Sequence, residues 1–440
     1  MNILFISLGC DKNLVDSEVM LGILAKDGHQ MVDDETMADV IIINTCCFIH
    51  DAKEESIQNI LEMAEYKKSG QVKALIVTGC LAQRYRQEIL DEIPEVDEVL
   101  GTTAYDKILD VVDRALEGEQ GIILSDLNAL PVSGAKRLVT TGGHFAYLKI
   151  AEGCDKHCTY CIIPKIRGNF RSVPMERLIK EAKELAEQGV KELILVAQET
   201  TLYGKDLYGE KCLHRLVEEL CKIAGIRWIR ILYCYPEEIT DELIEVIKKE
   251  PKVCHYLDLP IQHASDSILK RMGRRTSKQE LTDIVKKLRK EIPDICLRTT
   301  LITGFPGETE DQHEELMQFV DEMEFDRLGV FTYSPEEDTP AAVMPDQIAE
   351  EVKEERQADL MELQQEIAFD NAENMIGREM LVMIEGKVAD ENAYVGRTYR
   401  DAPNVDGLIF INTEEELISG DFAKVKITGA LEYDLIGELL

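Results

Sequence analysis

Short apolar runs alternate with amphipathic stretches over the first 130 residues of the chain. The runs have the length of buried strands, and in the stretches between them apolar residues recur at the helical period. This pattern predicts strands at 2–8, 40–44 and 74–78 and helices at 16–25, 52–65 and 83–91. Strands and helices that alternate in this way form an open, mostly parallel sheet. We therefore expect an α/β domain over residues 1–130.

The same alternation continues from residue 145 to about residue 370. It predicts strands at 146–150, 192–197, 228–233, 256–259, 296–302 and 327–333, and helices that include 174–188, 241–249, 278–290 and 309–322. A complete barrel of this kind has about eight strand–helix units. The shorter series predicts a partial (β/α)6 barrel, open on one side, over residues 140–370. A turn-rich stretch at 128–143 predicts a linker before it.

The last part of the chain has a mostly β pattern. Residues 347–374 predict a long charged helix, and Gly377 is a natural stop after it. Short apolar runs separated by Gly, Pro and Asn then predict strands at 380–384, 394–399, 407–411, 422–427 and 433–436. We expect a small, OB-like β-barrel over residues 373–440.

Composition places the chain among globular proteins, with 45% hydrophobic residues. Its longest apolar runs, such as 40–43 and 193–197, are far shorter than the roughly 18 residues needed to cross a bilayer. The N-terminus has no basic segment before its apolar stretch and no small-residue cleavage site, so a secretory signal is not expected. We therefore expect a cytoplasmic protein without a membrane partner.

The charge is strongly acidic, with 84 Asp or Glu, 49 Lys or Arg and a net charge of −35. Residues 377–440 carry 13 acidic and 6 basic side chains, a net charge of −7. Such a surface repels nucleic-acid phosphates, so direct nucleic-acid binding is not expected, although small barrels of this type often bind RNA. A basic protein partner suits it better. The alternative is that the acidity only keeps the protein soluble.

Twelve cysteines are unusual in a reducing compartment, where metal or redox chemistry is the leading explanation for them. Cys154, Cys158 and Cys161 form a C-x3-C-x2-C run directly after the predicted strand 146–150. Three thiolates on one loop can hold three irons of a four-iron cluster and leave the fourth iron free. The spacing resembles the signature of the radical S-adenosylmethionine superfamily, in which that iron binds the cofactor. The alternative is a zinc site with His157 as the fourth ligand.

Three further cysteines, Cys10, Cys46 and Cys80, each follow a predicted strand of the N-terminal domain. The carboxyl ends of parallel strands share one edge, so these thiols are expected to converge in the crevice where such folds place ligands. Gly9 and Gly79 permit sharp turns after two of the strands. We expect a second cluster site there; the alternative is that the three cysteines stand at strand ends by chance.

With these two triads the chain resembles the radical S-adenosylmethionine methylthiotransferases over essentially all of its 440 residues. The resemblance implies an N-terminal methylthiotransferase domain, a radical barrel and a C-terminal TRAM barrel, with two 4Fe-4S clusters and S-adenosylmethionine as cofactors. The auxiliary cluster would be held by Cys10, Cys46 and Cys80, and the radical-generating cluster by Cys154, Cys158 and Cys161. Cys47 is next to a matched position, so the choice between it and Cys46 stays open.

Residues 161–168 and 400–407 look like the RimO branch of this family. The resemblance implies transfer of a methylthio group to the β-carbon of an aspartate in small-subunit ribosomal protein S-twelve. It also implies two S-adenosylmethionine molecules, a sulfur donor and an electron donor such as flavodoxin or ferredoxin. Radical chemistry suits this carbon, because its C–H is too weak an acid for a side-chain base. Two alternatives stay open: methylthiolation of an adenosine in transfer RNA, and a noncatalytic iron–sulfur or zinc protein that binds the ribosome.

Further candidates for cofactor binding lie beside the first triad and at strand ends. Tyr160 resembles the superfamily aromatics that stack on the cofactor's adenine. Gln198 and Glu199 end the second barrel strand, and Gly304 and Glu308 follow the fifth, on the edge where barrels place their sites. The alternatives are a packing role for the tyrosine and a solvated turn for the others. The remaining cysteines share no ligand spacing and are interpreted as structural: Cys212, Cys221, Cys234, Cys254 and Cys296.

Overall fold

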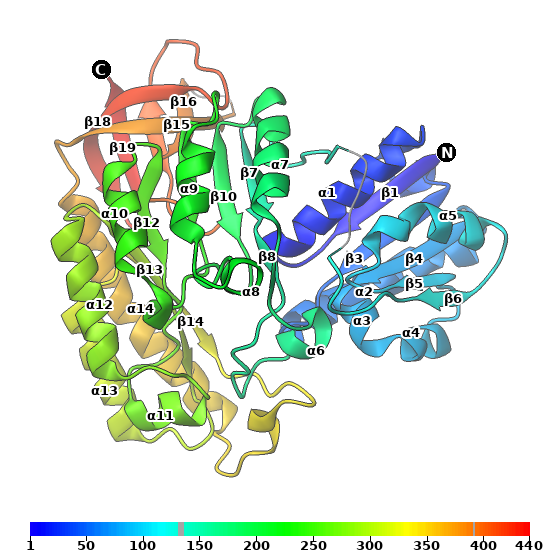
Figure 1. Cartoon of the computed structure of the whole chain (residues 1–440), viewed down its shortest axis with the longest axis horizontal. Helices are drawn as coiled ribbons and strands as arrows, with labels where there is room; N and C mark the ends of the chain where they lie inside the picture. Colours follow the sequence, from blue (N-terminus) through cyan, green and yellow to red (C-terminus); the bar gives the residue numbers. More distant parts are fainter. Residues whose placement is uncertain (131–135, 390–391) are drawn as a thin grey trace.

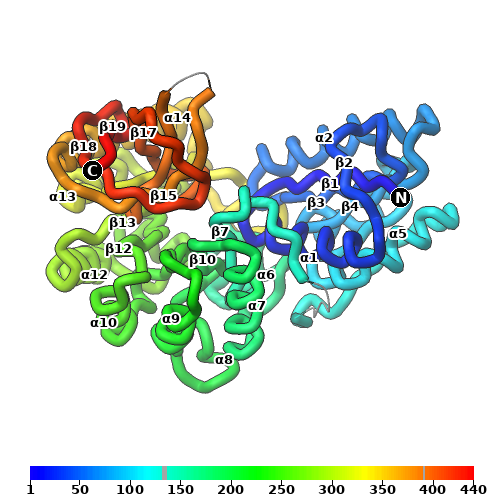
Figure 2. The backbone as a smooth tube through the Cα atoms, turned by 90° about the horizontal axis from the view of Figure 1, so that it is seen from above, coloured from blue at the N-terminus to red at the C-terminus, as the bar shows by residue number. Residues whose placement is uncertain are grey.

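The computed structural model of the chain describes residues 1–130, 136–389 and 392–440. Figure 1 shows the N-terminal sheet (blue) at one end of the molecule and the central sheet with its helices (green to yellow) at the other. The C-terminal barrel (orange to red) lies beside the central sheet, well separated from the N-terminal domain (Figure 2). The centre of the expected linker, residues 131–135, lies outside the described residues. None of the described helices is long and apolar enough to cross a membrane.

The N-terminal part is a parallel sheet with helices on both faces. Its strands are β1 (Asn2–Ser7), β2 (Gln30–Val32), β3 (Val40–Thr45), β4 (Ala74–Gly79), β5 (Glu98–Leu100) and β6 (Gly121–Ile123), in the order β2-β1-β3-β4-β5-β6. Its helices are α1 (Asp11–Lys26), α2 (His50–Lys68), α3 (Cys80–Tyr85), α4 (Gln87–Glu92) and α5 (Ile108–Leu116). Helices α2 to α4 cover one face and α1 and α5 the other, so β3 and β4 are buried on both sides.

The predicted strands of this domain correspond to β1, β3 and β4, whereas β2, β5 and β6 are too short for the hydrophobic pattern to reveal. The prediction of one helix over 83–91 is wrong. Helix α3 ends at Tyr85 and α4 begins at Gln87, because Arg86 between them has a left-handed φ of 43° that interrupts the helical path.

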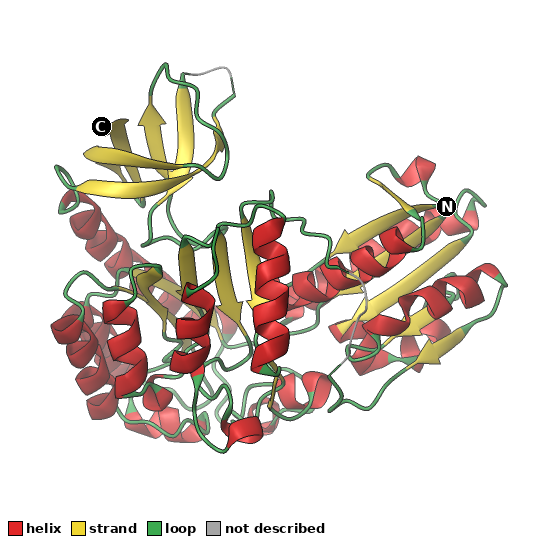
Figure 3. Ribbon diagram, turned by 45° about the horizontal axis from the view of Figure 1, so that its top comes forward, coloured by secondary structure: helices red, strands yellow, loops and turns green. Residues whose placement is uncertain are grey.

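The central part is an open parallel sheet whose helices cover its outer face (Figure 3). Its strands are β7 (Phe145–Lys149), β10 (Glu192–Val196), β11 (Trp228–Ile231), β12 (Val253–Asp258), β13 (Cys296–Thr303) and β14 (Arg327–Thr332), in the order β14-β13-β12-β11-β10-β7. The main helices are α7 (Met175–Glu187), α9 (Leu213–Cys221), α10 (Asp241–Lys249), α12 (Lys278–Glu291) and α13 (Glu310–Met323). Shorter elements are β8 (Ala151–Glu152), β9 (Arg171–Ser172), α6 (Ile163–Arg167), α8 (Lys205–Tyr208) and α11 (Asp266–Arg271). The prediction of a partial, open barrel is confirmed.

Helix α14 (Glu350–Glu373) leads from the central sheet to the C-terminal barrel. The barrel strands are β15 (Glu379–Lys387), β16 (Ala393–Arg397), β17 (Ile409–Asn412), β18 (Phe422–Leu431) and β19 (Asp434–Leu439). They close in the order β15-β16-β17-β19-β18. The prediction of a small closed β-barrel is therefore confirmed.

The C-terminal barrel packs on the amino ends of the central strands. Trp228 lies edge-on to Phe422, with ring centroids 4.9 Å apart. The buried carboxylate of Glu192 accepts hydrogen bonds from Arg230 and Arg397, each at 2.8 Å. Buried charges persist in proteins when they are paired in this way, so the two parts are joined by an apolar and an ionic contact.

The N-terminal domain packs on the opposite, carboxyl edge of the central sheet. Helix α1 lies against β7, and α6 inserts Ile166 into the apolar core beneath β3 and β4. The Thr102 hydroxyl donates to the Ile166 carbonyl at 2.9 Å. The carboxyl edges of the two parallel sheets thereby meet, which is where both folds place their ligands.

Candidate functional site

The first cysteine triad lies on the loop that follows β7 and β8. Cys154 and Cys158 are buried, and Cys161 is half-buried. Gly153 turns the chain into the loop with a φ of 77°, and a Cβ there would lie 2.5 Å from the carbonyl oxygen of Gly168. The turn therefore requires glycine, for its conformation and for the space.

Backbone amides of this loop point at two of its thiols. The Lys156 N–H donates to Cys154, and the Ile163 N–H donates to Cys161. Burial raises the pKa of Cys154 to about 11 and raises the pKa of Cys161 as well. Hydrogen bonds to sulfur favour the thiolate, and a bound metal ion removes the thiol proton outright. The donor set therefore fits iron.

His157 does not join this triad, because it is exposed and has a left-handed φ of 52°. No three Cys, His, Asp or Glu side chains among the described residues converge closely enough to hold one ion. A zinc ion needs its thiolates within about 2.3 Å of one point. The thiolates of a four-iron cluster each bind a different iron and stand further apart. His157 is therefore not placed as the fourth ligand that the zinc alternative requires.

The second triad lies at the carboxyl ends of β1, β3 and β4. A Cβ at Gly9 would lie 3.1 Å from the Cys46 sulfur. The charges of Cys10 and Cys80 raise the pKa of Cys46, after burial as the main cause, and the charge of Cys10 acts on Cys80 in the same way. Folding therefore brings together three thiols that are far apart in the sequence.

Asn13, which the sequence pattern did not single out, ties these strand ends together from the first turn of α1. Its Nδ2 donates to the carbonyl oxygens of Leu8 at 3.1 Å and Thr45 at 2.8 Å. Its Oδ1 lies 3.7 Å from the Cys80 sulfur. The signal that could have found it is its place in the helix that begins directly after Cys10.

Cys46 and Cys47 have different surroundings. Burial raises the pKa of each to about 12, but Cys46 faces Gly9 and receives the N–H of Phe48. Cys47 is completely buried in the apolar core beneath β3 and β4. The closeness of Cys46 to Gly9, the residue before Cys10, favours Cys46 as the ligand.

Arg167, at the end of α6, links the two triads. Its Nη2 donates to the Cys80 sulfur at 3.4 Å and also bonds Asn13. Its Nη1 donates to Asp16 at 2.7 Å and to Glu152 at 3.4 Å. Arg167 follows the first triad closely in the sequence. Its guanidinium therefore joins the loop that carries Cys154, Cys158 and Cys161, called the radical loop below, to the second triad.

Gln198 is the predicted cofactor residue that the structure brings against the first triad's loop. Its Oε1 accepts from the Gly153 N–H at 2.9 Å, and its Nε2 donates to Glu152 at 3.0 Å. Although burial acts to raise it, the charges of Lys149 and Arg167 lower the pKa of Glu152 to about 2. Gln198 therefore holds the turn before Cys154 in place.

The segment that follows β11 reaches both triads. The Tyr235 hydroxyl lies 3.9 Å from the Cys158 sulfur. The Tyr233 hydroxyl donates to Asp11 at 3.2 Å, directly beside Cys10. These tyrosines, absent from the sequence prediction, stand between the two triads.

Tyr160 and Glu199 lie near the first triad. Tyr160 packs on the apolar cluster that contains Met272 and Phe305. Glu199 is buried, accepts the Thr201 N–H at 2.9 Å and has an Oε2 without a hydrogen-bond partner among the described residues. Burial raises the pKa of Glu199 to about 7.

Gly304 and Glu308 belong to the loop after β13, where it packs on α14. Arg356 donates to Glu308 at 3.1 Å, and His263 lies 3.5 Å from the same carboxylate. A Cβ at Gly304 would lie 3.0 Å from the Cβ of Lys353. Among the described residues, both therefore contact side chains of this loop and of α14, and neither contacts the thiols of the first triad.

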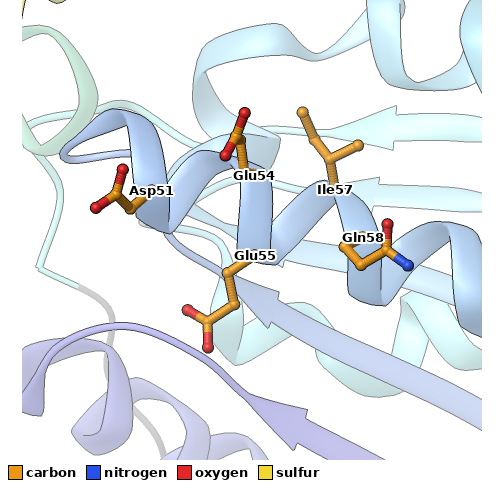
Figure 4. A pocket seen from close by; sticks show the side chains of 5 residues that line it. All are labelled: Asp51, Glu54, Glu55, Ile57 and Gln58. Carbon is orange, nitrogen blue, oxygen red and sulfur yellow. The ribbon is translucent and has the colours of Figure 1, made fainter.

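The five remaining cysteines are buried in the apolar cores of the central part, as expected of structural residues: Cys212, Cys221, Cys234, Cys254 and Cys296. A surface hollow lies elsewhere, beside the first turns of α2 (Figure 4). Its lining side chains are Asp51, Glu54, Glu55, Ile57 and Gln58. No thiol lines this hollow, so it is separate from the chemistry of the triads.

Three family models match the chain. Residues 2–101 match an uncharacterized protein family, UPF0004, residues 148–320 the radical SAM superfamily, and residues 376–440 the TRAM domain. Among solved structures, the radical S-adenosylmethionine methyltransferase TsrM from Kitasatospora setae is 13% identical, with a TM-score of 0.55. The match covers 78% of this chain and 77% of that one, and it shows a shared fold.

Curated relatives are far more similar. The ribosomal protein uS12 methylthiotransferase RimO of Lachnoclostridium phytofermentans is 66% identical over 437 residues, which is 99% of each chain. The protein of the same name from Clostridioides difficile is 51% identical, over 99% of this chain and 98% of its own. These matches span 99% of this chain and therefore include all three of its domains. The chain therefore belongs to the RimO family of radical S-adenosylmethionine methylthiotransferases.

Proposed function

We propose that this enzyme transfers a methylthio group to the β-carbon of an aspartate in ribosomal protein uS12, the S-twelve protein of the small subunit. Its cofactors are two 4Fe-4S clusters and S-adenosylmethionine, as in its family. The observation that carries the proposal is the meeting of two thiol triads, four of whose six thiols are buried, at facing sheet edges, with Arg167 and the Tyr233–Tyr235 segment between them.

We assign the radical-generating cluster to Cys154, Cys158 and Cys161 and the auxiliary cluster to Cys10, Cys46 and Cys80. Bound there, the cofactors supply a 5'-deoxyadenosyl radical for hydrogen abstraction, a sulfur atom and a methyl group. The three domains would span residues 1–130 and 140–370, which hold the cofactors, and residues 373–440, the TRAM barrel.

The chain's own residues orient and enclose these cofactors. Gln198 and Gly153 set the turn of the radical loop, and Asn13 sets the spacing of the three strand ends. Arg167 places a positive charge beside the Cys80 sulfur, where a cluster with thiolate ligands carries negative charge. Tyr160, Glu199, Gly304 and Glu308 stay proposed contacts of S-adenosylmethionine, and Glu199 Oε2, which is 3.9 Å from Lys156, accepts no hydrogen bond among the described residues.

The proposed partners follow from the same chemistry. The cluster needs an electron donor, for which we propose flavodoxin or ferredoxin, and a sulfur donor restores the sulfur used in each cycle. Ribosomal proteins are typically basic, which suits the net charge of −7 on residues 377–440. We propose that the enzyme acts in the cytoplasm, where its substrate is made.

Mass spectrometry of ribosomal proteins and transfer RNA, from cells with and without the gene, tests the proposal. We expect a methylthio group on one uS12 aspartate that disappears with the gene, and unchanged transfer RNA. Loss of a methylthio group from a transfer-RNA adenosine, with uS12 unchanged, would reverse the choice of substrate.

A further inference from the structure

A buried cation stands beside the second triad. Lys12 lies in the first turn of α1, close to Cys10, and its side chain is 8% exposed. Its Nζ is 3.3 Å from the centre of the Tyr233 ring and 2.7 Å from Asp11 Oδ1. A buried ammonium is costly unless several partners stabilise it. The chain has kept this charge at the place where the two sheet edges meet.

Lys12 and its partner Asp11 have hydrogen-bonding capacity that their contacts do not fill. Asp11 Oδ1 accepts from the Lys12 ammonium, the Lys12 backbone N–H and the Tyr233 hydroxyl. Asp11 Oδ2 is buried and has no hydrogen-bond partner among the described residues. The ammonium has three N–H donors, and among the described residues it contacts Asp11 Oδ1 and the ring and hydroxyl of Tyr233. This group can bind a further anion.

Tyr233 is held in a strained backbone conformation, with a φ of 58°. Its N–H donates to Asp258 at 3.1 Å, and its carbonyl accepts the Thr200 N–H at 3.1 Å. Left-handed conformations of non-glycine residues are unfavourable and concentrate at functional sites. These two backbone hydrogen bonds hold the conformation that places the ring under the Lys12 ammonium.

We propose that Lys12, held by Asp11 and Tyr233, binds the side-chain carboxylate of the aspartate that is modified. This inference rests on the proposed function. The β-carbon of that aspartate must reach both triads, and its carboxylate is one bond away from the β-carbon. Lys12 stands beside Cys10 and over the segment that reaches Cys158, so a carboxylate bound to it lies where this carbon is needed.

A charged anchor also determines specificity. A site built for a carboxylate binds the amide of the same shape more weakly, because the neutral amide forms no ion pair with the ammonium and leaves its remaining N–H without a charged acceptor. We therefore expect the enzyme to favour uS12 with aspartate at the modified position over uS12 with asparagine there.

The test compares Lys12→Met and Lys12→Arg with the unaltered enzyme, all reconstituted without oxygen. We expect Lys12→Met to bind uS12 at least about tenfold more weakly, to raise KM more than it lowers kcat, and to lose the preference for aspartate over asparagine. Lys12→Arg keeps the charge and should restore part of this preference. Iron content and substrate-free cleavage of S-adenosylmethionine should not change.

Arg84→Met is the matched control, because Arg84 makes another buried contact between the same two domains, at 2.9 Å from Glu336. It should leave the aspartate preference unchanged. If Lys12→Met binds uS12 as tightly as the unaltered enzyme and keeps the same preference for aspartate over asparagine, the proposed role of Lys12 is wrong. The proposed function would be unaffected by this result. Should Lys12→Met fail to load iron, Lys12→Gln takes its place, and unchanged discrimination there has the same meaning. An unaltered enzyme that loads both clusters, binds uS12 and leaves it unmodified would instead overturn the proposed function.

Discussion

The protonation of single side chains controls how the two triads can be loaded. Burial raises the pKa of Cys46 to about 12 and that of Cys154 to about 11, so both free thiols keep their protons at neutral pH. Iron displaces these protons when it binds, so loading releases protons and becomes more favourable as the pH rises. Arg167 and the backbone amides around the thiols offset part of the burial cost.

Removal of single thiols should separate the two clusters. We expect Cys154→Ala and Cys46→Ala each to keep about four of about eight irons, because each triad holds its own cluster. Cys154→Ala should lose reductive cleavage of S-adenosylmethionine. Cys46→Ala should keep that cleavage and lose the methylthio product. Iron and sulfide analysis, with detection of 5'-deoxyadenosine, measures all three quantities.

Cys47→Ala is the control for this assignment, because Cys47 adjoins Cys46 but lies in the apolar core. It should keep both clusters and lose only packing. If Cys47→Ala loses half of the iron and Cys46→Ala loses none, the assignment of these neighbours is reversed.

Glu199 should make stability depend on pH. Burial raises its pKa from 4.5 to about 7, so between these values the folded state holds a proton that the unfolded state has lost. Stability contributed by this group therefore falls as the pH rises through that window and levels off above it. Between pH 6 and pH 8 the loss is about 1 kcal/mol, and Glu199→Gln should remove it. Thermal unfolding of both proteins at the two pH values measures the difference; equal shifts would contradict the prediction.

At the scale of elements, the turns after the strands set the positions of the thiols. Gly9, Gly79 and Gly153 all have left-handed φ values, and each directly precedes a proposed ligand. A Cβ at Gly79 would lie 2.5 Å from the Thr45 carbonyl oxygen, so the neighbouring strand ends must approach without a side chain between them. The turn and the cluster site are therefore one structural unit.

Comparing Gly79→Ala with Gly70→Ala should distinguish the cost of backbone strain from the cost of a steric clash between the added Cβ and its neighbours. Gly70 also has a left-handed φ, 79°, but a Cβ there would meet no atom within 4 Å. Gly70→Ala should cost about 1 kcal/mol of unfolding free energy through backbone strain alone. Gly79→Ala should cost clearly more and lose the auxiliary iron. Denaturant unfolding and iron analysis check this, and equal effects of the two substitutions would argue against a tight turn at Gly79.

At the scale of the whole molecule, charge acts together with shape. The chain carries a net charge of −35, and its C-terminal barrel lies beside the central sheet (Figure 2). An acidic surface of this size attracts basic proteins over distances that salt can screen. It repels the phosphates of RNA, in contrast to many barrels of the same topology.

Binding of uS12 should therefore weaken as salt is raised from about 50 to about 300 mM, because the Debye length shortens. Transfer RNA should bind weakly at both concentrations. Titration of each labelled partner into the reconstituted enzyme measures the two affinities. Tight, strongly salt-dependent binding of transfer RNA would instead support the alternative substrate.

The sequence by itself predicted most of the elements and proposed both triads. Apolar periodicity and the spacing of Cys154, Cys158 and Cys161 are local properties, and they predicted the parallel sheets, the open barrel, the small β-barrel and the radical loop. The second triad was predicted from the rule that the carboxyl ends of parallel strands share one edge. The helix expected over 83–91 failed because a single left-handed residue, Arg86, leaves no periodic signal.

Only the tertiary structure decided how these parts meet. The contacts of Arg167 with Cys80 and of Lys12 with Tyr233 join residues that are distant in sequence, across the boundary between two domains. Cys46 and Cys47 are neighbours in the sequence, so the sequence does not show which of them faces the crevice. Their orientation at the end of β3 depends on the folded structure. The hydrophobic periodicity of a segment shows which face of a helix or strand is buried. The packing of two sheet edges depends on contacts between residues that are distant in the sequence, and local periodicity carries no information about these contacts.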